Sequence, residues 1–376
     1  MLYWLNEFSD VFSPLRMFRY ITFRTVMAAG TAFIFSLVLG PWLIEKLRAV
    51  NFGEQCEDTR VAALDRSSKV GTPTMGGLMI LFTTAAATVV WAVPGNFYVL
   101  CALTTFVFMG ILGFIDDYLK IKRAKGLSPR VKLLGQGVWT VILLFALFSN
   151  VETFQRTQQL MVPFFKDPVI ASMGIVGTFI FLALVLVGAS NAVNLTDGLD
   201  GLAIGCSNSA VAAYLALAYV AGHFTFAQYL QIPFVSGAGE LSVFCGALLG
   251  AGLGFLWFNC HPAKVFMGDT GSLAIGGGIA AVAILIKQEL VLIIVGGVFV
   301  MEAVSVLLQQ IWFKYTRKKY GAGRRIFRCA PLHHHFEYLA REQGKSVSAY
   351  ENRITIRFWI LGIIFALIGV ATLKIR

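Results

Sequence analysis

Ten long apolar runs, separated by polar segments, dominate the pattern of the chain. A transmembrane helix needs about 20 mostly apolar residues, and the runs approach that length. The pattern therefore predicts an all-α, polytopic membrane helix bundle of about ten transmembrane helices, with residues 1–376 forming a single integral-membrane domain. The runs lie at residues 21–43, 75–93, 97–115, 131–148, 174–190, 202–221, 241–258, 272–286, 290–313 and 354–373. The run at 272–286 is the weakest, because it is short and contains Gly276, Gly277 and Gly278.

The composition removes the main alternatives to a membrane protein. The chain is 57% hydrophobic and 14% charged, whereas soluble domains are about 45–50% apolar and about 25% charged. Its 32 phenylalanines supply ample surface to bury, which excludes a disordered chain. The six cysteines lack C-x-x-C spacing and predict neither disulfides nor a structural zinc site. Charges close to the first apolar run argue against a cleavable signal peptide.

The basic residues predict how the bundle is oriented. Of the 31 lysines and arginines, 22 fall in or beside the connections that ten spans would place on one side. These connections lie near residues 44–74, 116–130, 191–201, 259–271 and 314–353. By the positive-inside rule they face the cytoplasm, and both termini are periplasmic. The net charge of +11 does not indicate nucleic-acid binding, because the chain has no basic helix or aromatic-basic module of the usual kinds.

Carboxylates, amides and histidines gather in the same predicted cytoplasmic connections. They come from four distant parts of the sequence: Asp116 and Asp117; Asn191, Asn194, Asp197 and Asp200; Asn259, His261 and Asp269; and His333, His334 and His335. Helix bundles build sites from the facing ends of their helices. We therefore expect these groups to form one composite active site.

Asp116 and Asp117 end the third apolar run. A charged Asp at the bilayer centre costs about 2.5–3.5 kcal/mol, so the pair must lie at the interface with cations nearby. Neighbouring helical residues point about 100° apart, which predicts different roles for the two. Together with Asp269 they offer three hard oxygen ligands of the kind that suit Mg²⁺. The alternatives are a solvated helix end for the pair and an N-terminal cap for Asp269.

The run NAVNLTDGLDGLAIG repeats a polar residue at every third position from Asn191 to Asp200. A 3₁₀-like or unwound backbone would align these residues, whereas an α-helix would spread them. Gly198 and Gly201 permit such a backbone and the close approach of a ligand. A simple turn between two spans is the alternative.

The segment APLHHHFE places three histidines near Arg324, Arg325 and Arg328, which predicts donors to a polyanion. A zinc site with Cys329, or with Cys260 and His261, is the alternative, although the spacing fits no common pattern. Weaker candidates are Lys69, Thr72 and Thr74, as cationic or hydroxyl contacts, and Glu302, as a polar contact inside the ninth span.

Five segments resemble a known family, the polyprenyl-phosphate N-acetylhexosamine-1-phosphate transferases. They are KVGTPTMGG, GFIDDYLK, NAVNLTDGLDGL, FMGDTGS and PLHHHFE, spread in this order from Lys69 to Glu337. TPTMGG and PLHHHFE are similar to the branch that handles muramoyl-pentapeptide. The resemblance implies transfer of phospho-N-acetylmuramoyl-pentapeptide from UDP to undecaprenyl phosphate, giving lipid I and UMP. It further implies Mg²⁺, a bacterial inner-membrane location among membrane lipids, and a homodimer.

The residues and the resemblance together predict the site. The expected catalytic residues are Asp116, Asp117, Asp269 and His333, with Asp269 and Asp117 as metal ligands. The expected substrate-binding residues are Lys69, Thr74, Lys120, Lys132, Asn194, Asp197, Gly198, Asp200, Asn259, Phe266, His334 and His335. The resemblance implies that Phe266 stacks on uracil and that the histidines lie at the diphosphate.

The expected chemistry is phosphoryl transfer, which depends on positioning and charge neutralisation. A phosphate monoester with a second pKa of about 6 is mostly dianionic at neutral pH, which favours direct attack over a covalent aspartyl-phosphate. Two rival functions remain at this stage. One is an N-acetylglucosamine-1-phosphate transferase that uses the same lipid. The other is a secondary transporter, which would show inverted repeats and a site at mid-bilayer.

Overall fold

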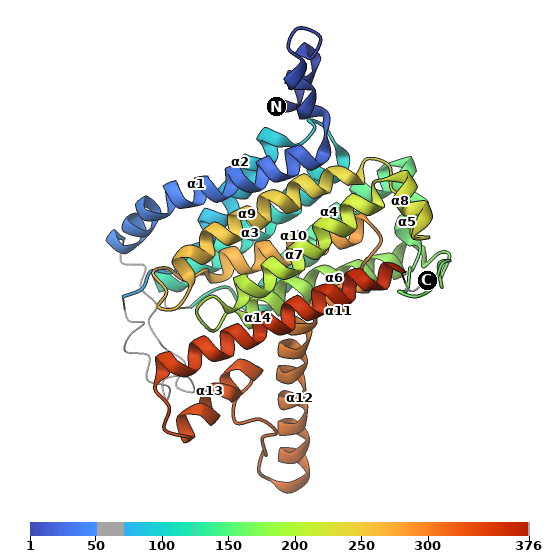
Figure 1. Cartoon of the computed structure of the whole chain (residues 1–376). Coiled ribbons are helices and arrows are strands. Elements are labelled where there is room, and N and C mark those ends of the chain that lie inside the picture. Colours follow the sequence, from blue (N-terminus) through green and yellow to red (C-terminus); the bar gives the residue numbers. More distant parts are fainter. Residues whose placement is uncertain (51–70, 124, 375–376) are drawn as a thin grey trace.

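The computed structural model describes residues 1–50, 71–123 and 125–374, which form helices joined by turns and loops (Figure 1). An isolated β-bridge joins Leu160 and Ile170. The α-helices are α1 (Ile21–Ala49), α2 (Gly77–Trp91), α3 (Phe97–Arg123), α4 (Pro129–Ser149), α5 (Val151–Gln158), α6 (Gly174–Thr196), α7 (Leu202–Ala221), α8 (Phe224–Tyr229), α9 (Leu241–Asn259), α10 (Gly268–Leu285), α11 (Val291–Val295), α12 (Gly297–Tyr320), α13 (Leu332–Glu342) and α14 (Val347–Ala371). Short 3₁₀ helices are η1 (Leu2–Phe8), η2 (Ser13–Arg19), η4 (Ala238–Glu240) and η5 (Thr372–Lys374). The described cysteines are free thiols.

The predicted membrane helix bundle is confirmed. Nine of the described helices are long and apolar enough to cross a membrane. The remaining predicted span, the second in the chain at residues 75–93, forms α2. This helix is apolar but has only 15 residues. At 1.5 Å per residue α2 rises about 22 Å, which is shorter than the hydrocarbon core of about 30 Å.

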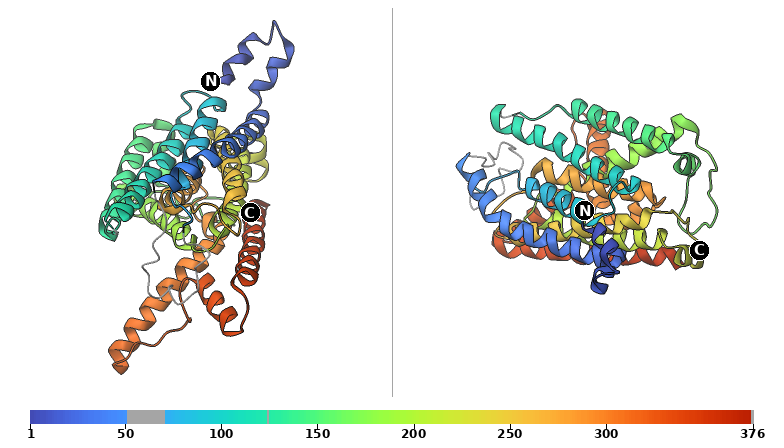
Figure 2. Two further views of the ribbon diagram at one scale, coloured as in Figure 1. Left: turned by 90° about the vertical axis from the view of Figure 1, so that its left-hand side faces the viewer. Right: turned by 90° about the horizontal axis from the view of Figure 1, so that it is seen from above.

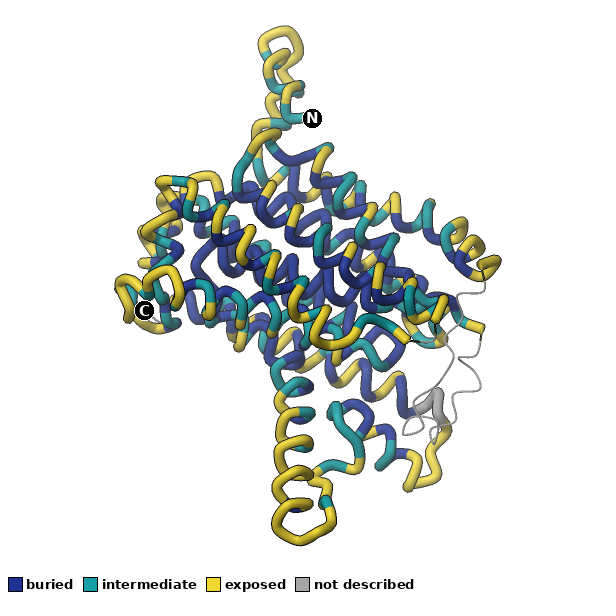
Figure 3. Tube along the Cα trace, turned by 180° about the vertical axis from the view of Figure 1, so that it is seen from behind, coloured by how far each residue is buried: buried dark blue, intermediate teal, exposed yellow. Residues whose placement is uncertain are grey.

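The prediction of a single span at residues 290–313 is wrong. The chain forms the short helix α11, breaks at Gly296, and continues as α12. Figures 1 and 2 show α12 leaving the bundle at a steep angle to its neighbours, and Figure 3 shows that much of it is exposed. Both sides of the break are apolar, so hydropathy gave no sign of it.

Helix α10 is the centre of the bundle. It packs against α3, α6 and α2, and 94% of its residues are buried. The glycines that weaken its hydropathy allow this contact: a Cβ on Gly276 would lie 2.6 Å from the Cα atom of Ser190 in α6. Small residues let membrane helices approach closely, so the run predicted to be weakest is the most enclosed helix.

A buried ion pair fixes the opposite end of the bundle from the predicted site. Arg24 of α1 donates from both terminal nitrogens to the Glu240 carboxylate before α9, each at 2.6 Å. Arg24 also donates to the Trp91 carbonyl oxygen, and Glu240 accepts from the Val93 amide. The two side chains therefore tie α1, α2 and α9 together at this end.

Candidate active site

Three aspartates meet where α3 ends and α10 begins. Asp116 and Asp117 lie in α3, and Asp269 lies in the first turn of α10. All three are buried, and one oxygen of each lies within 4.8 Å of the others. We call Asp116, Asp117 and Asp269 the acid cluster. Its charges would repel one another strongly in this buried setting, so it requires cations.

Two lysines supply the positive charge within the described structure. Lys120 Nζ lies 2.7 Å from Asp116 Oδ2, 3.1 Å from Asp269 Oδ1 and 3.5 Å from Asp117 Oδ1. Lys132 Nζ, from α4, lies 2.8 Å from Asp116 Oδ2 and 2.5 Å from Asp269 Oδ2. Three carboxylates and two ammonium groups leave one net negative charge, and the ammonium groups stand between oxygens that could ligate a divalent cation.

Asp117 caps helix α10 from another helix. Its Oδ1 accepts from the Asp269 amide at 3.1 Å, and its Oδ2 accepts from the Thr270 amide at 2.9 Å and the Thr270 hydroxyl at 2.7 Å. A negative charge at a helix N-terminus is favourable for the macrodipole. Asp117 therefore fixes the backbone that carries Asp269, which explains what holds an acid at the C-terminal end of α3.

Asp116 has different partners, as the helical geometry predicts. Its Oδ1 accepts from the Leu127 amide at 2.6 Å, so the connection between α3 and α4 folds over it. Its Oδ2 contacts the two lysines. Asp117 thus holds the start of α10, and Asp116 contacts the lysine ammonium groups.

Asn194 joins α6 to the acid cluster. Its amide donates to Asp269 Oδ1 and to Ser272 Oγ, each at 2.8 Å. The expectation of a 3₁₀-like row from Asn191 to Asp200 is wrong, because α6 stays α-helical to Thr196. Asn191 instead donates to Gln136 of α4 at 3.0 Å.

The segment before α2 lies beside the segment before α10. The Phe266 amide donates to the Pro73 carbonyl oxygen, and the Gly76 amide donates to the Phe266 carbonyl oxygen, each at 2.8 Å. This pairing brings Thr74 near Gly268 and the acid cluster. Lys69, the other candidate in this segment, lies outside the described residues.

The three histidines have different surroundings on α13. His333 is fully buried, with its ring 3.3 Å from Glu302 of α12, and its amide donates to the same carboxylate at 3.2 Å. His334 contacts Glu337 at 2.5 Å, and His335 accepts from the Arg328 amide at 3.2 Å.

Gly198 connects the histidines with the loop after α6. A Cβ on Gly198 would lie 2.2 Å from His333 Nε2, so only glycine fits here. Asp197, which ends α6, is partly buried beside it. The loop thus runs from Asn194 at the acid cluster to His333.

Asp200 and Asn259 brace the same loop from its far side. Asn259 accepts from the Gly201 amide at 3.1 Å and donates to the Val265 carbonyl oxygen at 2.8 Å. Asp200 accepts from the Ala263 amide at 3.1 Å and lies 3.0 Å from the His261 ring.

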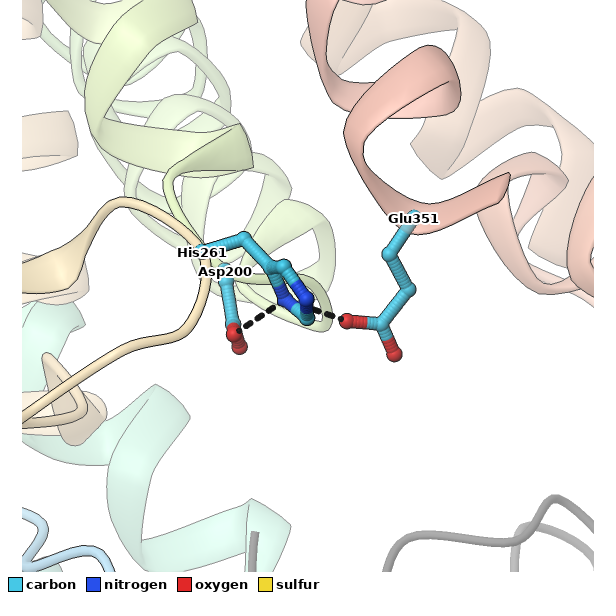
Figure 4. A group of neighbouring side chains, drawn as sticks. All are labelled: Asp200, His261 and Glu351. Atoms are coloured by element: carbon cyan, nitrogen blue, oxygen red, sulfur yellow. Dashed lines mark hydrogen bonds and ion pairs between the residues drawn. The ribbon is translucent and has the colours of Figure 1, made fainter. Parts of the chain in front are cut away.

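His261 is also 3.1 Å from Glu351 of α14, and Figure 4 shows the imidazole between the two carboxylates. Within the described chain, this trio and the acid cluster are the groups close enough to share a metal ion; the histidine run is not such a group. Glu351 was missed in the sequence, where the only sign was an acid directly before the last apolar run.

An apolar groove of about 340 Å³ lies beside α6 and α10, the helices that carry Asn194 and Asp269. Its walls come from α6, α7, α10, α11 and α12, with Phe181, Gly188, Val193, Ile279 and Phe299 among the lining residues. From Phe181 to Val193 the groove follows α6 for about 18 Å, at 1.5 Å per residue. It ends one residue before Asn194, whose amide binds Asp269.

The chain is similar to known proteins over almost its full length. A family model described as glycosyl transferase family 4 matches residues 99–287, and the model "phospho-N-acetylmuramoyl-pentapeptide-transferase signature 1" matches residues 69–81. The chain is 50% identical to the phospho-N-acetylmuramoyl-pentapeptide-transferase of Solidesulfovibrio magneticus over 97% of each chain. It is 47% identical to that of Maridesulfovibrio salexigens and 44% identical to that of Methylacidiphilum infernorum, each over 100% of both chains.

Proposed function

The chain belongs to the phospho-N-acetylmuramoyl-pentapeptide-transferase family, and we propose that it transfers phospho-N-acetylmuramoyl-pentapeptide from UDP to undecaprenyl phosphate, giving lipid I and UMP. The observation that carries this proposal is the buried acid cluster with its two lysines, together with an apolar groove whose lining on α6 ends at Val193, next to Asn194. A phosphate on a long apolar chain and a soluble diphosphate would meet there.

The transfer is a direct displacement. An oxygen of the lipid phosphate forms a bond to the sugar-bearing phosphorus, and the bond from that phosphorus to the bridging oxygen breaks, so UMP leaves with that oxygen. The attacking monoester is mostly dianionic at neutral pH, so a strong general base is not needed. The protein has to bring two polyanions together and offset their charge.

Lys120 and Lys132 supply that offset, because their ammonium groups lie among the acids and are partly exposed. Asp116 holds the lipid phosphate through these ammonium groups. Asp269 and Asp117 would hold Mg²⁺, and their fit is supported by hard oxygen donors packed closely enough to need cations. When bound, Mg²⁺ neutralises charge across the diphosphate.

The nucleotide-sugar side lies along the loop after α6 and the segment before α10. Asn194, Asp197, Gly198 and Asp200 line or brace that loop, and Asn259 holds it in place. Phe266 is partly buried next to the acid cluster, where its ring could stack on uracil. The remaining proposed contacts are Lys69, Thr74 and the histidines, with His333 as a catalytic donor to the diphosphate and His334 and His335 beside it.

The groove between α6 and α12 takes part of the undecaprenyl chain. Its walls are apolar, and burial of a lipid chain is worth about 0.8 kcal/mol per CH₂, so the lipid stays in the bilayer while its phosphate reaches the acid cluster. The site then lies at the cytoplasmic face of the inner membrane, where the basic connections gather, with both termini periplasmic. A homodimer of the single 1–376 domain is part of the same proposal.

A UMP-release assay tests the function. Purified protein in detergent receives undecaprenyl phosphate and Mg²⁺ with either UDP-N-acetylmuramoyl-pentapeptide or UDP-N-acetylglucosamine. We expect UMP and lipid I only with the muramoyl substrate and only when the lipid is present. Turnover of UDP-N-acetylglucosamine alone would assign the sibling reaction, and no UMP release in detergent would contradict a transferase.

A further inference from the structure

Glu351, His261 and Asp200 form a buried row from three separate parts of the chain. His261 Nδ1 lies 3.0 Å from Asp200 Oδ2 and 3.1 Å from Glu351 Oε2. The side chains of Asp200 and Glu351 are 3% and 1% exposed. Figure 4 shows the imidazole reaching from the α9–α10 connection into the space between the two acids. Burying two carboxylates costs free energy unless they are paired and hydrogen-bonded, so the row indicates a specific structural or functional role.

The row belongs to a larger set of contacts that holds the Asp200–Gly201 turn. The Asp200 carbonyl oxygen accepts from the Thr355 hydroxyl at 3.2 Å, and the Gly201 carbonyl oxygen accepts from the Trp359 indole at 3.0 Å. The three residues of α14 in these contacts, Glu351, Thr355 and Trp359, are spaced four residues apart and therefore lie on one face of the helix. This face contacts His261 and donates hydrogen bonds to the turn. Most polar groups of the turn are therefore fixed by α14 or by the α9–α10 connection.

The same helix is linked to the histidine run. Helix α14 follows α13 in the chain, and the rings of Phe336 in α13 and Phe358 in α14 are 6.2 Å apart. At the start of α13, His333 packs against Gly198, two residues before Asp200. The row thus fixes the distance between the loop that would bind the nucleotide and the histidines that would face the diphosphate.

We propose that His261 and Glu351 are positioning residues that set the Asp200 carboxylate and its loop for the nucleotide part of the substrate. This inference rests on the proposed function, because it assigns the row to the UDP side of the same site. His261 does not touch the reacting phosphorus; it acts through Asp200. Loss of the row should weaken nucleotide binding and leave lipid binding intact.

The test measures KM for each substrate separately. We expect His261→Leu to raise the KM for UDP-N-acetylmuramoyl-pentapeptide about tenfold to 100-fold, the usual effect of losing a hydrogen bond to a charged group. The KM for undecaprenyl phosphate and kcat at saturation should stay within about threefold of wild type. His261→Asn should restore nucleotide binding, because its amide reaches the Nδ1 position, whereas His261→Gln, which reaches the Nε2 position, should not.

The controls separate positioning from general stability. Glu351→Gln should raise the nucleotide KM in the same way, and His223→Leu, at the other end of the bundle, should not. His261→Leu added to Asp200→Asn should cost nothing further, because the two act through one contact. Thermal unfolding of each variant reports any structural loss.

Three results would overturn the inference. One is a nucleotide KM within twofold of wild type in His261→Leu. The second is an equal loss of kcat in His261→Leu, Asn and Gln together with a lower melting temperature, which would mean a structural role alone. The third is stoichiometric zinc in purified wild type that His261→Leu lacks, which would make the row a metal site. If wild type itself releases no UMP, the proposed function fails instead.

Discussion

Asp117→Asn should damage both stability and activity, because Asp117 caps α10 beside the proposed metal site. The carboxylate accepts three hydrogen bonds from Asp269 and Thr270 at the start of α10. Asparagine has one acceptor oxygen, so its NH₂ group must face at least one donor of α10. The lost charged hydrogen bond costs about 1.5–3 kcal/mol. The lost charge at the helix N-terminus adds about 0.3–1 kcal/mol.

The stability effect is therefore about 2–4 kcal/mol, which should lower the melting temperature of the detergent-solubilised protein by several degrees. UMP release should fall at least about 100-fold, because Asp269 loses its fixed backbone. Asp269→Asn should lose the same activity and should also lower the melting temperature, because Lys120 and Lys132 lose a buried carboxylate partner. The matched control is Asp167→Asn, an exposed acid far from the site.

Two melting-temperature results would refute the reasoning. If Asp117→Asn melts like wild type, its hydrogen bonds to α10 do not stabilise the bundle. If Asp269→Asn melts like wild type, the contacts of Asp269 with Lys120 and Lys132 do not stabilise the bundle.

Three further predictions follow from other contacts. Lys132→Met should slow UMP release at least about tenfold. It should also tighten divalent-metal binding in a titration, because the Lys132 ammonium group competes with the metal for the acid cluster. Weaker metal binding in this variant would contradict the prediction. Gly188→Leu should raise the KM for the lipid alone, because Gly188 lines the groove and a Cβ there meets nothing within 4 Å. The control is Gly137→Leu on α4, where a Cβ also meets nothing within 4 Å, and equal effects of both variants would refute the lipid groove. Glu240→Ala should destabilise the protein by about 3–5 kcal/mol, because Arg24 stays buried without its carboxylate partner, and the nucleotide KM should not change. An unchanged melting temperature would contradict this prediction.

The sequence predicted the bundle because long apolar runs have few alternatives to membrane helices. It failed where a break carried no polar signal. Gly296 interrupts the run at 290–313, but apolar residues stand on both sides, so α11 and α12 read as one span. The departure of α12 from the bundle depends on packing, which hydropathy does not describe.

The sequence names the residues of the candidate site but not their contacts. The meeting of Asp116, Asp117 and Asp269 was expected from their shared end of the bundle, and the structure brings them within 4.8 Å. The capping of α10 by Asp117 and the link from His261 to Glu351 were not predicted. Such contacts depend on how distant helices rotate against one another, and a single sequence carries no direct record of that rotation.

Divalent-cation binding to the purified protein tests the central claim most directly. Electron paramagnetic resonance can follow Mn²⁺ bound by wild type, by Asp269→Asn and by His261→Leu, without any substrate or turnover. The account predicts saturable Mn²⁺ binding that Mg²⁺ displaces in wild type and in His261→Leu, and its loss in Asp269→Asn. Equal binding by wild type and Asp269→Asn would contradict the claim that the acid cluster is the metal-holding centre of the site.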